Sequence, residues 1–112
     1  SYTQEWMSGI TFEDAKKMLE EALKQKPDDA YILDSMAWYY FKVDRFEDSL
    51  RLFEYAILLD PSDPTINDHF GDVLWKSGKF SQARYQWKKA LDVNEDQLSQ
   101  DKIKKKLILG II

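Results

Sequence analysis

The sequence predicts an all-α fold: a right-handed α-solenoid in which a helix-turn-helix unit of about 34 residues repeats and a last helix caps the array. Pro27 and Pro61 lie one such period apart, and each closes a stretch of the same pattern. Within a unit, apolar residues recur at spacings of three, four and seven, which places them on one face of a helix. No segment alternates between apolar and polar residues for long enough to predict a strand.

We expect residues 1–29 to form a partial repeat. Tyr2 to Ser8 is then the remnant of its first helix, and residues 12–26 are its second helix, which Pro27 ends. The pattern of that helix returns one period later. The first copy is Phe12, Ala15, Leu19, Ala22, Leu23 and Pro27, and the second is Phe46, Ser49, Phe53, Ala56, Ile57 and Pro61.

Residues 30–63 form a complete repeat, with helices expected at 30–43 and 46–59. Asp44 and Glu47 have the spacing of a capping box, so Asp44 is expected to cap the second of these helices. The next complete repeat covers residues 64–97, with helices at 65–77 and 80–93. Pro64 suits the first turn of a helix, and Gly78 suits the turn between two helices.

The third copy of the second-helix pattern consists of Phe80, Ala83, Trp87, Ala90 and Leu91. Trp87 and Trp6 fall on core positions. Residues 98–112 are expected to cap the array, with a helix at 97–109, so that residues 1–112 make one domain. A chain of 112 residues, 44% of them hydrophobic, is long enough to bury one core.

This repeat resembles the tetratricopeptide repeat (TPR) over essentially the whole chain. Small residues recur where the paired helices of a TPR approach closely, as Ala37 opposite Ser49 and Gly71 opposite Ala83. The sequence departs from the family pattern mildly: Asp44 stands for the glycine in the middle of the repeat and Glu95 for the closing proline. The resemblance implies a protein-protein interaction scaffold that binds a peptide or protein segment in a concave groove.

Residues 32–38 and 64–75 also look like the C-terminal repeats of exported bacterial TPR proteins, some of which are lipoproteins. This narrower resemblance implies the bacterial periplasm or the inner face of the outer membrane, with the cytoplasm as the alternative. A periplasmic protease or an envelope protein is then the expected partner. It also implies that the chain is part of a longer array, in which these repeats serve either as the binding site or as a purely structural C-terminal capping segment.

Placing the family's groove-facing positions on this sequence gives eight candidate residues for binding a protein or peptide. They are Tyr31, Asp34, Trp38, Phe41, Asp68, His69, Asp72 and Trp75. The alternative for the aromatic members is packing against the following repeat. Because the set is aromatic and acidic, we expect apolar or basic segments to bind in preference to acidic C-terminal tails. Family members that bind such tails carry Lys, Asn and Arg where this sequence has Asp34, Thr65 and His69.

Composition argues against several other functions. With no cysteine and one histidine, we expect no catalytic residues, no metal site and no cofactor, and hence no enzyme. Asp68, His69 and Asp72 supply too few ligands on suitable faces to hold a metal ion. The net charge of −4 argues against nucleic acid as a partner, and no apolar run is long enough to span a membrane.

Charge and apolar residues are unevenly distributed along the chain. Residues 97–112 hold four lysines and one aspartate, whereas residues 1–96 are acidic. We expect Lys102, Lys104, Lys105 and Lys106 to form a solvated helix face. The two ends carry more apolar residues than terminal helices with one solvent-exposed face require. Leu19 and Leu23 lie near one end, and Ile103, Leu107 and Ile111 lie near the other. We therefore expect the chain to self-associate through one end or both.

Overall fold

A computed structural model describes residues 11–111, and these residues form six α-helices and no strand. The all-α prediction is confirmed, and each predicted helix boundary is correct to within one residue. The segment Tyr2 to Ser8, with Trp6, lies outside the described residues. The helices are α2 (Phe12–Gln25), α3 (Ala30–Lys42), α4 (Phe46–Leu59), α5 (Pro64–Lys76), α6 (Phe80–Val93) and α7 (Gln97–Leu109).

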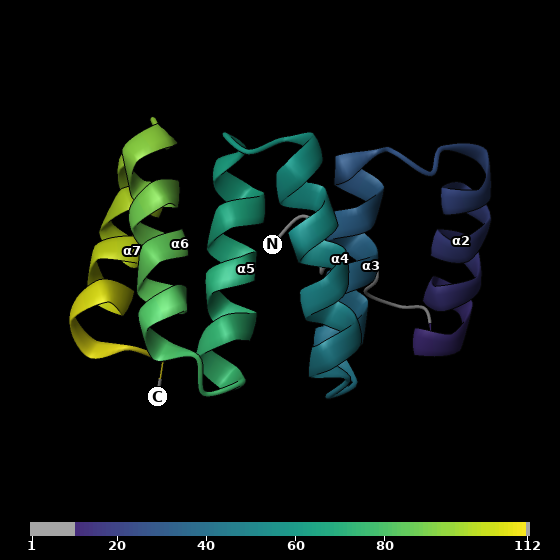
Figure 1. Cartoon of the computed structure of the whole chain (residues 1–112), viewed down its shortest axis with the longest axis horizontal. Coiled ribbons are helices and arrows are strands. Elements are labelled where there is room, and N and C mark those ends of the chain that lie inside the picture. Colours follow the sequence, from purple (N-terminus) through teal and green to yellow (C-terminus); the bar gives the residue numbers. More distant parts are fainter. Residues whose placement is uncertain (1–10, 112) are drawn as a thin grey trace. The chain divides into compact units, whose positions relative to one another are not determined.

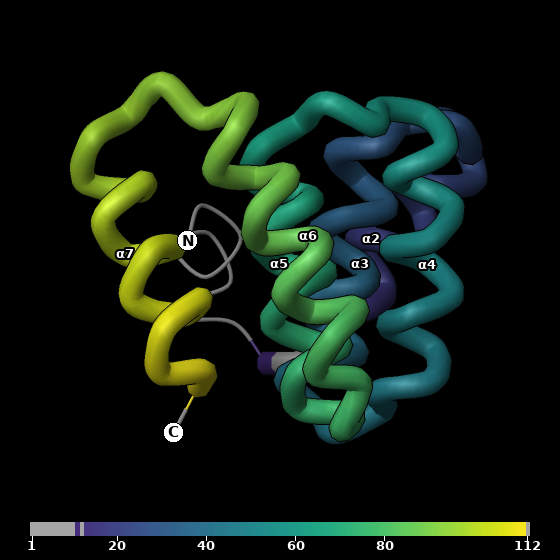
Figure 2. Tube along the Cα trace, turned by 60° about the vertical axis from the view of Figure 1, so that its left-hand side comes forward, coloured from purple at the N-terminus to yellow at the C-terminus, as the bar shows by residue number. Residues whose placement is uncertain are grey.

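The chain divides into two compact units, residues 1–59 and residues 60–112. In the first unit, α3 packs against both α2 and α4. In the second unit, α6 packs against both α5 and α7 (Figure 1). Figure 2 shows the same helix pairs from another side. The division falls just after α4, close to the expected repeat boundary between residues 63 and 64. That residues 1–112 behave as one domain stays a prediction.

Side-chain caps fix where several helices begin. Asp29 accepts a hydrogen bond from the backbone N–H of Ile32 at 3.1 Å, and Asp63 accepts one from Ile66 at 2.9 Å. Pro64 occupies the first turn of α5, where its missing N–H costs nothing. Each cap satisfies an amide that the helix leaves unpaired, so the polar residue before each apolar pattern sets the boundary.

The turn between α3 and α4 corrects one prediction. Asp44 does not cap α4, because Ser49 N–H donates to the carbonyl of Arg45 and so places Arg45 at the cap position. Asp44 instead adopts a left-handed backbone with φ of 62°. Gly78, the equivalent residue of the next repeat, has φ of 82°. Aspartate tolerates this conformation better than most residues, which explains how it replaces the usual glycine.

The core of the first unit depends on a close approach of α3 and α4. Ala37 and Ser49 are both completely buried, and the Ser49 hydroxyl donates to the Ala37 carbonyl at 2.7 Å. This contact confirms that the two small residues face each other. Phe53 is also completely buried, as its place in the repeat requires. A further cluster of Leu19, Met36 and Tyr39 joins α2 to α3.

In the second unit, the backbone of α5 lies directly against an indole ring of α6. A Cβ atom added to Gly71 would lie 2.4 Å from Cδ1 of Trp87, far inside contact distance. Trp87, Ala83 and Ala90 are completely buried, so Trp87 is a core residue as predicted. The glycine is therefore required because the tryptophan fills the space that any side chain would occupy.

The two apolar ends are partly covered within their own units. Leu19 and Ile103 are buried, while Leu107 and Ile111 are half-buried. Ile108 and Leu109 remain exposed, together with Leu58 and Leu98. Self-association stays a prediction, with less apolar surface available for it than the sequence suggested.

We expect Gly71→Ala to lower the free energy of unfolding by about 1–3 kcal/mol, because the new methyl group overlaps the Trp87 indole. Urea denaturation followed by circular dichroism measures the loss. In a Trp87→Leu background the same substitution should cost much less. An equal cost in both backgrounds would show that the overlap is not the cause.

Candidate protein-binding site

Four of the eight candidate residues lie on α3 in the first unit. Tyr31 is 50% exposed and Phe41 is half-buried, so both present surface to a ligand. Asp34 and Trp38 are buried, at 3% and 6% exposure. Asp34 therefore contributes less to an acidic surface than the sequence suggested, because its carboxylate lies among packed side chains.

Aromatic rings and a lysine form a small patch at the end of α3. The rings of Trp38 and Phe41 have centroids 5.0 Å apart, and Phe41 lies 5.7 Å from Phe46. The Lys42 ammonium sits 5.2 Å from the Trp38 ring centroid, close enough for a cation-π interaction. Trp38 thus supports the patch from below, while Phe41 and Lys42 reach the surface.

The other four candidates lie on α5 in the second unit. His69 is buried, whereas Asp68, Asp72 and Trp75 are half-buried. These three half-buried residues are brought together by contacts with the C-terminal segment that contains α7. That segment was expected to be a cap with a solvated basic face, and its part in the site was not foreseen.

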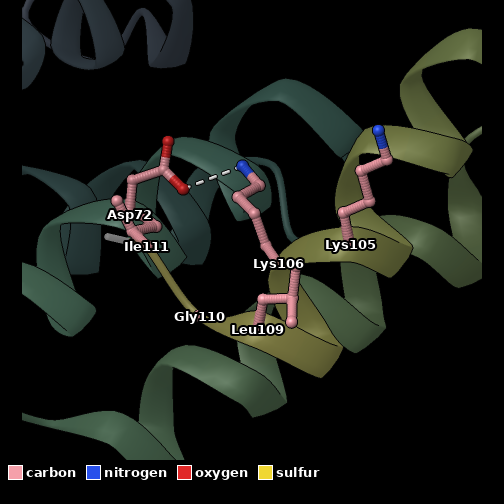
Figure 3. Close-up of a pocket in the computed structure, with 6 residues that line it drawn as sticks. All are labelled: Asp72, Lys105, Lys106, Leu109, Gly110 and Ile111. Atoms are coloured by element: carbon pink, nitrogen blue, oxygen red, sulfur yellow. Dashed lines mark hydrogen bonds and ion pairs between the residues drawn. The ribbon is translucent and has the colours of Figure 1, made fainter.

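Lys106 of α7 pairs with both carboxylates of α5. Its ammonium donates to Asp72 Oδ1 at 2.8 Å and also to Asp68, and the dashed line of Figure 3 marks the first of these bonds. The same oxygen of Asp72 accepts a hydrogen bond of 3.0 Å from the Trp87 indole N–H. The Lys106 ammonium also lies 5.4 Å from the Trp87 ring centroid. The lysine neutralises one of the two negative charges, so the cluster carries a net charge of −1 when all three groups are ionised.

Burial and ion pairing have opposite effects on the pKa values of Asp72 and Lys106. Burial raises the pKa of Asp72, and the nearby Asp68 carboxylate adds to that effect, which exceeds the lowering caused by Lys106. Burial alone would lower the pKa of Lys106, but the two carboxylates outweigh it and the pKa is raised. Lys106 thus favours the ionised form of Asp72, and the two carboxylates favour the ammonium form of Lys106.

Trp75 holds the chain that follows α7. Its indole N–H donates to the carbonyl of Ile111 at 3.0 Å. The Trp75 ring also stacks on Trp87, with centroids 5.5 Å apart. The guanidinium of Arg84 lies 5.1 Å from the centroid of the Trp75 ring. The indole is thus fixed by its neighbours and offers one directed hydrogen-bond donor.

A pocket of about 410 Å³ opens between α5 and the end of α7 (Figure 3). Aliphatic side chains and the lysine stem form much of its wall, and the Asp72 carboxylate lies at one side. The residues that line it are Asp72, Lys105, Lys106, Leu109, Gly110 and Ile111. An aliphatic side chain with a polar backbone group beside it matches this lining.

Sequence reasoning missed Lys106, although one signal pointed to it. Asp72 and Lys106 are separated by one repeat period, so they occupy the same position in successive units. Equivalent positions of neighbouring repeats lie near one another in a helical array. A lysine one period after an aspartate therefore predicts the ion pair that the structure contains.

Residues 11–111 contain no group of three or more histidine, cysteine, aspartate or glutamate side chains placed to hold a metal ion. Within the same range, none of the helices combines the length and the apolar character needed to cross a bilayer.

No protein-family model matches the sequence, and no curated protein is significantly similar to it. Solved structures are similar in fold. A Yersinia enterocolitica type III secretion translocator chaperone, SycD, has a TM-score of 0.83 and 16% identity over 94% of this chain and 74% of its own. PcrH, solved with the chaperone-binding region of PopD, has a TM-score of 0.82 and 15% identity over 96% and 83%.

A third similar structure is the second TPR domain of Spaghetti (RPAP3) bound to an HSP90 peptide, with a TM-score of 0.74 and 19% identity over 83% of this chain and 86% of its own. At these identities the similarity is one of fold. The chain therefore has the all-α, solenoid-like fold of TPR proteins, as the sequence predicted. The exported bacterial group of TPR proteins is not among these structures, so that part of the resemblance stays a prediction.

We expect Lys106→Met to lower the free energy of unfolding at pH 7 by about 1–2 kcal/mol, because two half-buried carboxylates lose their cation. The substitution raises the pKa of Asp72 further above its unfolded value. A raised carboxyl pKa favours the folded state below that pKa and loses this contribution as the pH rises, so the deficit should shrink toward about pH 4.

Urea unfolding at the two pH values measures this effect. Lys105→Met is the matched control, because Lys105 is exposed on the same helix and should change stability by less than about 0.5 kcal/mol. A deficit that is equal for the two variants, or that grows on acidification, would contradict the assigned role of Lys106.

Proposed function

We propose that the chain is a protein-interaction module that binds an aliphatic segment of a partner protein on the surface formed by α5 and the end of α7. The fold supports this function, since TPR-like arrays present helix faces to protein ligands. Among proteins of similar fold, PcrH and Spaghetti were solved with a protein region and a peptide bound. The residues of this chain, not those neighbours, define the proposed site.

The pocket beside Asp72 is the observation that carries the proposal. It combines an aliphatic wall with a carboxylate whose charge is already balanced by Lys106. Leu109 is 66% exposed at its edge, so a ligand side chain that contacts it removes apolar surface from water. Such a site favours aliphatic side chains.

The charges around the pocket are balanced. Asp68 and Asp72 face Lys106 and the exposed Lys105 of the pocket lining, so the four groups carry no net charge and favour a neutral segment. The HSP90 peptide in the Spaghetti structure, SRMEEVD, ends in acidic residues. In this chain the positions at which TPR relatives bind such tails carry Asp34, Thr65 and His69, so we expect peptides of that kind to bind poorly.

Phe41 and Lys42, at the end of α3, offer a second contact surface in the first unit. Lys42 is exposed and Phe41 is half-buried, which suits an aromatic contact with a peptide backbone or side chain. We assign this surface a supporting role, because the Phe41 ring packs against Trp38 and Phe46 and leaves only part of its area to a ligand.

A purely structural cap is the alternative function, and one observation favours it. Ile103 of α7 is buried against its unit while Lys102, Lys104 and Lys105 face solvent, as expected for a helix that ends an array. The two functions differ in what the pocket does: a cap leaves it empty, and a binding module fills it. The bacterial envelope, and a periplasmic protease or envelope protein as partner, remain proposals that depend on the sequence resemblance.

An array of synthetic peptides, screened with the purified chain, tests the function. We expect aliphatic neutral or basic peptides to be retained over peptides with acidic C-termini. Leu109→Gln should then weaken the retained peptides about tenfold in fluorescence anisotropy, since one aliphatic contact is lost.

Ile108→Gln is the matched control, because Ile108 is 77% exposed on the same helix and does not line the pocket. Its affinity should stay within about twofold of the unmodified chain. Equal losses in both variants, or selection of acidic C-terminal peptides, would contradict the proposed site.

A further inference from the structure

The chain turns sharply at the end of α7 and then runs across α5. Gly110 closes the helix: its N–H donates to the Lys106 carbonyl at 2.8 Å, and its φ of 71° redirects the backbone. We call the following stretch, Gly110 and Ile111, the tail. The tail is no longer helical, and it contacts Trp75 of α5 in the second unit.

The tail is bound through its backbone. The Trp75 indole N–H donates to the carbonyl of Ile111 at 3.0 Å, and this bond uses no feature of the isoleucine side chain. Any extended segment that places a carbonyl at the same point could accept the same bond. The side chain of Ile111 is half-buried and forms part of the pocket wall, which adds a requirement for an aliphatic group.

Contact with Trp75 also selects the residue before that carbonyl. A Cβ atom added to Gly110 would lie 2.2 Å from Cζ2 of Trp75 and 2.5 Å from Cη2. The indole cannot yield easily, because it is stacked on the buried Trp87. Trp75 therefore accepts a glycine between two aliphatic residues and excludes larger residues at this position.

The tail is held less firmly than the helix before it. Ile103 anchors α7 with 1% exposure, and Lys106 pairs with two carboxylates, whereas the tail has one hydrogen bond from Trp75 and one half-buried side chain. Loss of the tail contact would leave the anchors of α7 in place. We call the surface of Trp75 that the tail contacts the seat. The tail can leave the seat without unfolding of the unit.

We propose that the seat on Trp75 is a peptide-binding subsite that the chain's own tail occupies, and that a partner binds by inserting an aliphatic-glycine-aliphatic segment in its place. The inference rests on the proposed function, since Gly110 and Ile111 also line the pocket beside Asp72 and a partner segment that replaces them supplies that wall itself. The tail acts as an internal competitor. The apparent affinity for a partner is reduced by the fraction of molecules whose seat is closed.

The test uses the full chain and two altered forms. Gly110→Ala drives the tail away from Trp75 by steric overlap, and a form that lacks residues 110–112 removes it. Gly78→Ala is the matched control, because Gly78 also has a positive φ, of 82°, but a Cβ added there meets nothing within 4 Å. It imposes similar backbone strain without touching the seat.

The probe is a fluorescein-labelled synthetic peptide that copies residues 104–112, with a second peptide that has valine in place of the glycine. Both altered forms should bind the first peptide at least about tenfold more tightly than the full chain or Gly78→Ala, a difference well within the range of anisotropy titrations. The valine peptide should bind every form weakly. The Trp75 indole N–H resonance, assigned with Trp75→Phe, should move in the two altered forms and stay unchanged in Gly78→Ala.

Each of the following outcomes would contradict the proposal that the tail competes with a partner. Equal affinity in all four proteins, with binding still sensitive to Leu109→Gln, would refute the competition and leave the interaction module standing. An indole resonance that Gly110→Ala and the deletion both leave unchanged would show that the tail is not seated on Trp75. Equal binding of the valine peptide would refute the glycine requirement, and failure of the peptide to bind either altered form would refute the subsite.

Discussion

The buried indole of Trp87 is the constraint on which the second unit depends. It fills the space beside Gly71 and brings the backbone of α5 close to α6. From that position its N–H donates to Asp72, its ring lies under the Lys106 ammonium, and its ring also stacks on that of Trp75. One core residue therefore orients an anion, a cation and a hydrogen-bond donor at the surface, and these three groups define the proposed binding site.

The same arrangement explains why the surface of the proposed site is not strongly charged. Asp68 and Asp72 both pair with Lys106, so much of their negative charge is neutralised within the protein. What remains for a ligand is an aliphatic wall, a backbone-directed N–H from Trp75 and a steric limit at the indole. Shape and apolar contact decide specificity in such a site, while long-range charge contributes less.

The helices, their boundaries and the close contacts between paired helices could be predicted from the sequence, because periodicity, caps and small residues act locally or at a fixed repeat spacing. Trp87 was placed in the core on the same grounds. The left-handed role of Asp44 was missed because its spacing to Glu47 imitates a cap. The ion pair of Lys106 was missed although its spacing of one repeat period from Asp72 predicts it. The position of the tail could not be predicted, because a single glycine with positive φ decides the direction of the chain after α7. The burial of Asp34, Trp38 and His69 likewise follows from tertiary packing, which repeat register alone does not specify.

Intermolecular nuclear Overhauser effects between an isotope-labelled chain and an unlabelled aliphatic-glycine peptide show directly where the peptide binds. We expect contacts from the peptide to the Trp75 indole and to the Leu109 methyl groups, with loss of the contacts between Trp75 and Ile111 of the chain itself. Contacts confined to other helices, or a bound peptide that leaves the Trp75 to Ile111 contacts intact, would contradict this expectation.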